Sequence, residues 1–291
     1  MRDYVILTDS GCDLDKEVRK KYGIDYVKLP IFIDETESFS DLDWEEFSPE
    51  QYYAWMREGK KPRSSQINPS VYEEVFLSYL KKDLDVICFA LAGALSGSVN
   101  SARIARDVVL ENNKEAKIIV IDSKISSLGQ GFLLIEAANK KAEGFTIDAL
   151  ADYIENERYN YHQVGSVLDL VYLKRAGRIS GPAAVMGKII NLKPIVISDV
   201  NGANFSSQKV IGRKVSIKTS LDYVARHIIN PTEQVVGIVH ADCYAEALEI
   251  KEALLAKFHV KDVYINWVDP AIGASVGPGM FGIYFKGDRR K

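Results

Sequence analysis

Small hydroxyl residues gather at one loop in the N-terminal half of the chain. Ser96, Gly97 and Ser98 follow an apolar run at residues 85–91 and precede apolar residues at helical spacing. This order predicts a buried strand, a tight loop and a helix. Such a loop brings two hydroxyl groups, free backbone N–H groups and the positive end of a helix dipole to one point, where an anion could bind. The same pattern also fits a turn whose residues are small only because the backbones pack closely.

Asp-Ser pairs close two of the predicted strands. Asp9 and Ser10 follow the apolar residues 4–7, and Asp122 and Ser123 end another apolar run. Ligands of open α/β sheets bind at the carboxyl ends of the strands, so these side chains are candidates for a pocket. They also suit turns in which an Asp or Ser side chain binds nearby backbone N–H groups. The two interpretations are compatible.

Polar and basic side chains on two further segments complete the candidates. Ser64 and Ser65 are hydrogen-bond donors on a loop bounded by prolines, a pattern that also fits the entry of a helix. Lys174, Arg175 and Arg178 form a compact basic spot in an acidic protein, which could bind phosphate or an acidic partner. The same basic residues also suit a helix C-terminus, where they complement the dipole.

The elements that must position these residues alternate strand and helix in the first half. Four strand-then-helix units in residues 1–147 predict an α/β domain with a mostly parallel sheet and crossover helices. One strand is expected at residues 26–33, followed by an irregular acidic segment at 34–43. Residues 148–291 mix hairpins with helices, including a helix at 183–190, and predict a C-terminal α+β domain.

Composition and motifs argue against several classes of function. The 291 residues carry a net charge of −3, which argues against nucleic-acid binding, and no apolar run is long enough to span a membrane. No signal peptide is expected, and a reducing cytoplasm fits three widely spaced cysteines that lack the spacing of a zinc site or a disulfide framework. We expect no cofactor and no metal. With little acid–base machinery, the sequence favours binding over turnover.

Seven short motifs together resemble the DegV family, and the resemblance covers essentially the whole chain. In chain order they are Thr8-Asp9-Ser10-x-x-Asp13-Leu14, Ser64-Ser65-Gln66, Leu95-Ser96-Gly97-Ser98, Asp122-Ser123, Leu173-Lys174-Arg175-x-Gly177-Arg178-Ile179, Leu192-Lys193-Pro194 and Gly277-Pro278-Gly279. The resemblance implies a carrier that holds a long-chain fatty acid in a buried tunnel between or beneath its domains. It also implies a role like the acyl-binding subunit of bacterial fatty acid kinase, which presents the acyl carboxylate to a separate catalytic subunit.

Residue roles follow from this resemblance. It places a group of donors at the fatty-acid carboxylate: Ser64, Ser65, Ser96, Gly97 and Ser98. It places a second group in the pocket or in loops near the site: Asp9, Ser10, Asp122, Ser123, Ser275 and Gly277. It implies contacts to the kinase or to phosphate for Arg175, Arg178 and Arg213. Ser275 stands where the family often has a histidine that is implied in handling the acyl phosphate.

Elementary energetics fit the carrier. Burying a sixteen-carbon chain gains on the order of 10 kcal/mol gross, at about 0.8 kcal/mol per methylene. A buried carboxylate cancels much of this gain unless hydroxyl and N–H donors bind it. At most transient membrane contact is expected.

Two alternatives come from other classes of function. The first is an enzyme that acts on a phosphate or ester of a small molecule and uses Asp9 and Ser10. The second is an interaction protein that binds its partner through the basic spot at residues 174–178.

Overall fold

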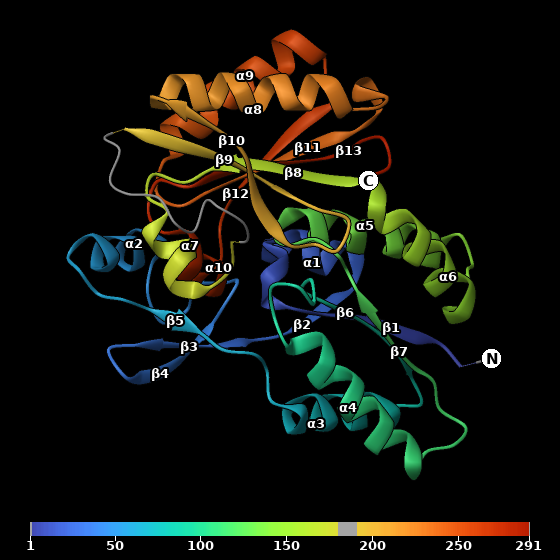
Figure 1. Cartoon of the computed structure of the whole chain (residues 1–291). Coiled ribbons are helices and arrows are strands. Elements are labelled where there is room, and N and C mark those ends of the chain that lie inside the picture. The colour runs from blue at the N-terminus through green and yellow to red at the C-terminus, as the bar shows by residue number, and fades with distance from the viewer. Residues whose placement is uncertain (1, 180–190, 291) are drawn as a thin grey trace.

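Three β-sheets organise the computed structural model, which describes residues 2–179 and 191–290. The helix expected at 183–190 lies outside these residues. Figure 1 shows the strands of the first half of the chain below and the six-stranded sheet of the second half above. Within the described ranges, none of the helices has the length and apolar character needed to cross a membrane.

The lower sheet is parallel and has the strand order β2-β1-β6-β7. Its strands are β1 (Tyr4–Asp9), β2 (Ile24–Val27), β6 (Asp85–Ala90) and β7 (Ile118–Asp122). Every residue of β6 is buried, because helices cover both faces of the sheet. Figure 1 shows α3 and α4 below the sheet, with α1 and α5 above it and α6 beside α5. These helices are α1 (Lys16–Tyr22), α3 (Pro69–Leu80), α4 (Ser98–Glu111), α5 (Leu128–Ala142) and α6 (Ile147–Glu157). The predicted α/β arrangement is confirmed.

A small antiparallel sheet with the order β4-β3-β5 corrects two expectations. The strand expected at residues 26–33 is interrupted at Lys28, so its first part ends β2 and its second part forms β3 (Leu29–Ile33). The acidic segment expected to be irregular contains β4 (Thr36–Ser40), and β5 (Arg63–Ser64) completes the sheet.

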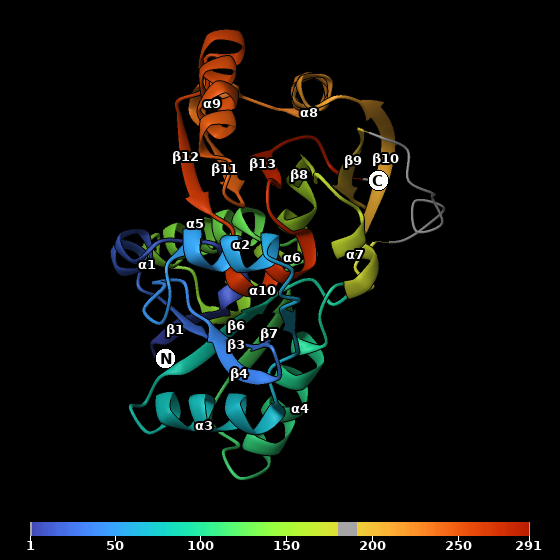
Figure 2. The ribbon, with the colours of Figure 1, turned by 90° about the vertical axis from the view of Figure 1, so that its left-hand side faces the viewer.

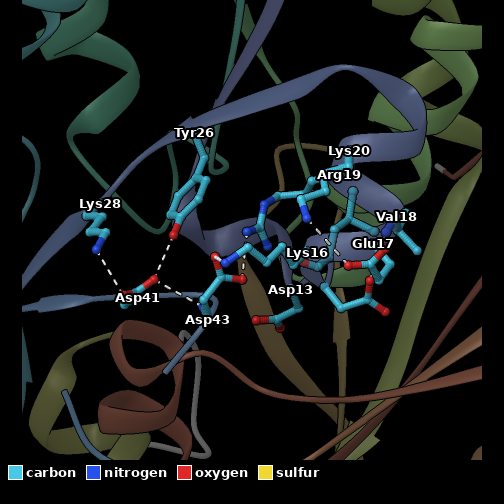
Figure 3. Close-up of polar contacts among 12 residues, drawn as sticks. Asp13, Lys16, Glu17, Val18, Arg19, Lys20, Tyr26, Lys28, Asp41 and Asp43 are labelled. Atoms are coloured by element: carbon cyan, nitrogen blue, oxygen red, sulfur yellow. Dashed lines mark hydrogen bonds and ion pairs between the residues drawn. The ribbon is translucent and has the colours of Figure 1, made fainter. Parts of the chain in front are cut away.

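Polar contacts bind the end of the acidic segment to the preceding strand and helix (Figure 3). Asp41 accepts hydrogen bonds from the Tyr26 hydroxyl at 2.7 Å and from the Lys28 ammonium group at 2.9 Å. Asp43 forms an ion pair with Arg19 of α1 at 2.8 Å. These contacts hold the residues after β4 beside β2 and α1.

Helix α2 (Pro49–Arg57) is a packed insert. Ser48 is its N-cap and a proline occupies its first position, a combination typical of a helix start. Its Tyr52 hydroxyl donates to the carbonyl of Pro270 at 2.7 Å, and its Tyr53 hydroxyl donates to the carbonyl of Val268 at 2.8 Å. These bonds join the first half of the chain to a segment near its end.

The upper sheet has six strands in the order β10-β9-β8-β13-β11-β12. They are β8 (Tyr161–Ser166), β9 (Leu192–Ser198), β10 (Asn204–Ile211), β11 (Val235–His240), β12 (Asp262–Trp267) and β13 (Phe281–Lys286). Only β11 and β12 pair in parallel among these described strands. Helices α8 (Arg213–His227) and α9 (Tyr244–Phe258) cover the outer face, and the short α7 (Val171–Ala176) lies on the inner side (Figure 2). The predicted C-terminal α+β domain is confirmed.

Helix α10 (Pro270–Val276) belongs to the second half of the chain but is fastened to the first. Its N-cap Asp269 accepts a hydrogen bond from Ser40 Oγ at 2.5 Å, and the Asp269 N–H donates to the Asp13 carboxylate at 2.7 Å. Burial, together with the neighbouring Asp269 carboxyl, raises the pKa of Asp13 well above its usual range. Figure 2 shows α10 between the two large sheets, and one buried core contains residues of both halves. The domain boundary between residues 147 and 148 stays a prediction.

Candidate functional site

The carboxyl ends of β1 and β6 lie side by side where the order of the parallel sheet reverses. The chain leaves β1 toward β2 on one side and leaves β6 toward β7 on the other, which opens a crevice at these two strand ends. Asp9, at the end of β1, accepts a hydrogen bond at 2.7 Å from the N–H of Leu91, which follows β6. The topology therefore predicts the ligand site at this edge.

A cavity with an empty volume of about 530 Å³ occupies this position. Its polar wall is formed by Ser64, Ser65, Ser96, Arg178 and Ser275. Its apolar wall comes from both halves of the chain and is formed by Leu29, Leu91, Leu95, Leu173, Ala271, Ile272 and Val276. Hydroxyl groups on one side and leucine and isoleucine on the other suit a ligand with one polar end and an apolar body.

A second cavity, of about 440 Å³, continues the first beneath the six-stranded sheet. The residues that line both cavities are Ser126, Leu173, Asn204, Ile272 and Val276. Strands β8, β9 and β13 contribute the remaining wall, together with Val167 and Met280. Because they share part of their walls, the two cavities adjoin one another between the sheets, and the two together are called the passage.

The serines at the start of α4 form a chain of hydrogen bonds. The backbone N–H of Ile67 donates to Ser98 Oγ at 3.2 Å, and Ser98 Oγ lies 3.0 Å from Ser96 Oγ. Ser96 Oγ also accepts from the Ser98 N–H at 3.2 Å. When the buried Ser98 hydroxyl donates to Ser96, the Ser96 hydrogen is left to donate into the cavity. A Cβ at Gly97 would lie 1.8 Å from Gln66 Oε1, so a larger residue there requires the Gln66 side chain to move.

Asp9 and Ser10 are fully buried and position residues of the cavity wall. The Asp9 carboxylate accepts hydrogen bonds from the backbone N–H of Leu91 and, at 3.0 Å, from the side-chain amide of Gln130. Ser10 Oγ accepts from the N–H of Leu29 at 3.1 Å. Burial raises the pKa of Asp9 to about 6. Both polar side chains are thus engaged with the protein backbone, and the leucines that they hold face the cavity.

Asp122 and Ser123 order the turn after β7. Asp122 Oδ1 accepts from the N–H groups of Gly93 and Lys124, both at 3.1 Å, and its other oxygen pairs with the Lys124 ammonium group at 2.8 Å. Ser123 Oγ donates to the carbonyl of Ile125 at 2.7 Å. These contacts match the interpretation of the Asp-Ser pair as a turn. The bond from Gly93, which lies three residues before Ser96, also connects this turn to the serine loop.

A basic hollow adjoins the serine side of the first cavity, with an empty volume of about 600 Å³. Ser64, Arg178 and Ser275 line both spaces. The hollow adds three cationic side chains, from Lys61, Arg63 and Arg175. Arg178 Nε donates to the carbonyl of Leu95 at 3.0 Å, which anchors its guanidinium group beside the Ser96 loop. The structure therefore brings Arg175 and Arg178 together with the predicted carboxylate site.

Arg213 and Gly277 have different surroundings. Arg213 forms a two-point ion pair with Glu246 of α9, at 2.8 and 2.7 Å, and donates to the carbonyl of Gly279 at 2.7 Å. Its guanidinium group is thus bound within the upper part of the protein. Gly277 ends α10 with φ of +76°, and a Cβ there would lie 2.3 Å from the ring of Tyr172.

Comparison with known proteins identifies the family. A family model described as an uncharacterised protein of the DegV family matches residues 3–287. The chain belongs to the DegV family. A DegV domain-containing protein of Clostridium perfringens is 35% identical over 291 residues and covers 100% of both chains. Another, from Caldanaerobacter subterraneus, is 33% identical over 286 residues and covers 98% of this chain and 99% of its own.

Solved structures of DegV proteins share this fold. A DegV family protein from Thermus thermophilus, described by its fatty acid binding, superposes with a TM-score of 0.87 at 26% identity, covering 98% of this chain and 100% of its own. DegV from Bacillus subtilis, described as a fatty acid binding protein, has a TM-score of 0.82 at 27% identity and covers 98% and 99%.

A polar bridge inside this DegV passage is not apparent from the sequence. Ser126 Oγ donates to Gln163 Oε1 at 3.1 Å, and Gln163 Nε2 donates to Asn204 Oδ1 at 2.7 Å. Ser126 and Asn204 line the junction of the two cavities. The three residues come from separate segments and each is an ordinary polar residue locally, so no spacing in the sequence connects them.

Proposed function

We propose that this DegV protein is a carrier that binds a long-chain fatty acid and has no catalysis of its own. The observation that supports this function best is the passage itself, with hydroxyl donors and Arg178 at one side and apolar side chains from both sheets along the rest. The Thermus thermophilus and Bacillus subtilis relatives, described by their fatty acid binding, add independent support.

In this proposal the carboxylate lies at the serine side. Ser96 donates its hydroxyl hydrogen, with Ser98 behind it, and Ser64, Ser65 and Ser275 offer further hydroxyls from the facing walls. Hydrogen bonds to an ionised acceptor are about twice as strong as neutral ones, which offsets the cost of removing the carboxylate from water. The acyl chain then follows the passage beneath the upper sheet.

We further propose that the carrier works in the cytoplasm and presents its carboxylate to the catalytic subunit of a fatty acid kinase. The basic hollow supports this step, because Lys61, Arg63 and Arg175 surround the point where the carboxylate would meet solvent. Cationic side chains there suit both a phosphoryl group and an acidic partner surface. Ser275, which stands where the family resemblance implies a histidine, would supply a hydroxyl at this place.

Native mass spectrometry followed by organic extraction tests the binding function. Protein purified from a bacterial host should carry one long-chain fatty acid per chain, and the extract should identify the acyl group. A mass equal to that of the bare chain, with no uptake of added fatty acids, would overturn the proposal and favour the enzyme that uses Asp9.

The presentation step needs a separate measurement. With a purified fatty acid kinase catalytic subunit and ATP, the protein should support acyl phosphate formation. Arg175→Glu should abolish this product while the bound fatty acid remains, since Arg175 lies on the exposed side of the hollow. Unchanged product formation by the variant would remove the basic hollow from the proposed docking surface.

A further inference from the structure

Two imidazole rings and a carboxylate from three distant segments converge at the outer end of the upper sheet. His162 lies in β8, His227 is the last residue of α8, and Asp288 follows β13. His227 Nδ1 lies 2.8 Å from Asp288 Oδ1, and His162 Nε2 lies 3.6 Å from the same oxygen. Sequence spacing predicts no metal site, because these residues come together only when the strands pair and α8 packs on them.

The three groups have the composition of a transition-metal site. Their potential ligand atoms lie within 4.8 Å of one another, and this is the one such His/Cys/Asp/Glu group in the described part of the chain. Imidazole nitrogen and carboxylate oxygen are preferred ligands of Zn²⁺, which binds them at about 2.0–2.2 Å. His162 Nε2 also lies 2.6 Å from the carbonyl oxygen of Asp288. Together with the two imidazole nitrogens and the Asp288 carboxylate oxygen, that carbonyl oxygen could complete a set of four ligand atoms from these three residues.

The groups around the three side chains support metal binding, and one of them carries a positive charge that opposes it. The Tyr223 hydroxyl lies 3.0 Å from His162 Nδ1, where it fixes the ring and can accept a hydrogen from that nitrogen once Nε2 binds a metal. His227 and Asp288 are partly open to solvent, with side-chain exposure of 31% and 55%, which gives an ion a way in. The Arg290 guanidinium group is the nearby positive charge, and it is bound to carbonyl groups of Asp199 and other residues.

We propose that His162, His227 and Asp288 bind one Zn²⁺ ion, which attaches the C-terminal segment to β8 and α8. Each ring binds the ion as a neutral imidazole, so its one hydrogen moves to the nitrogen that faces away from Asp288; in His162 that nitrogen is Nδ1, beside the Tyr223 hydroxyl. In the metal-free protein the same atoms form the hydrogen bonds described above. The site lies apart from the fatty-acid passage, so it acts on the attachment of the chain end and not on the ligand.

Isothermal titration with zinc sulfate tests the site on full-length protein that is free of any affinity tag and has been dialysed against a chelator. The expected result is one Zn²⁺ per chain and a higher melting temperature. His227→Gln and Asp288→Asn should each weaken binding by at least about tenfold. Both residues are partly exposed, so the variants should fold, and circular dichroism checks this. His259→Gln is the matched control, because His259 is exposed at the end of α9.

The outcomes separate clearly. A wild-type protein that binds no stoichiometric zinc overturns the proposal. So does zinc binding that survives both His227→Gln and Asp288→Asn, since the ion would then bind elsewhere. Loss of zinc in these two variants, with the fatty-acid content and the His259→Gln control unchanged, supports the site independently of the carrier function.

Discussion

Replacing Ser96 with alanine is the sharpest test of the proposed carboxylate site. The Ser96 hydroxyl is the end of the chain that runs from the Ile67 N–H through Ser98, and it lines the cavity proposed for the carboxylate, so its hydrogen can donate there when Ser98 donates to Ser96. A hydrogen bond to a charged group contributes about 1.5–3 kcal/mol. Its loss therefore predicts a fatty-acid dissociation constant about 10- to 150-fold higher than that of the wild type.

The assay is displacement of a fluorescent fatty acid from delipidated protein. Ser98→Ala should also weaken binding, although Ser98 is fully buried, because its hydroxyl no longer donates to Ser96. It should in addition lower the free energy of unfolding by about 1–3 kcal/mol, since the Ile67 N–H loses its partner. Ser78→Ala, which removes an exposed hydroxyl on α3, is the control. A Ser96→Ala affinity within twofold of wild type would refute the assignment of the carboxylate to this loop.

Three further predictions concern stability. Burial raises the pKa of Asp9 to about 6, so the folded state keeps a proton that the unfolded state has lost above about pH 4. Burial also lowers the pKa of His162 and of His240 to about 4, and these two groups act in the opposite sense over the same pH range. Urea denaturation should therefore compare wild type with Asp9→Asn: as the pH rises from 4 to 6, the wild type should lose on the order of 3 kcal/mol of stability relative to the variant. Gly165→Ala should destabilise by about 1–3 kcal/mol or more in the same assay, because a Cβ there would lie 2.2 Å from the Phe281 carbonyl oxygen of the neighbouring strand; a stable variant would contradict the sheet register. Arg213→Met should lower the melting temperature without changing acyl phosphate formation with the kinase catalytic subunit, and a selective loss of that product would support the contact with the kinase or phosphate that the family resemblance implies for this residue.

Local patterns in the sequence account for most of the lower half of the protein. The run that becomes β6 is apolar throughout its centre, and Ser48 with its following proline specifies the start of α2. The serines at 96 and 98 lie in a loop whose residue sizes alone predict a strand-to-helix turn. In each case neighbouring residues determine the outcome, so the signal is present in a short window.

Distant pairings account for what local patterns do not reveal. The acidic segment becomes a strand by pairing with β3, and Lys28 and Arg19 bind the carboxylates that follow it, contacts that no short window of sequence shows. The bridge through Gln163 joins segments that are distant in sequence, and no motif marks it. Ser64 approaches the Ser96 loop through the pairing of β5 with β3 and through the bond from Ile67 to Ser98, and its assignment to the carboxylate depended on family resemblance.

The attachment of α10 bears on how the protein melts. Sequence organisation divides the chain into two units, yet Asp269 is bound by Ser40 and Asp13, and the carbonyl of Pro270 is bound by Tyr52. Separating the two sheets would therefore break buried hydrogen bonds and open the shared core at once. We expect one calorimetric transition whose van't Hoff and calorimetric enthalpies agree, so that what the chain order divides into two domains unfolds as a single cooperative unit.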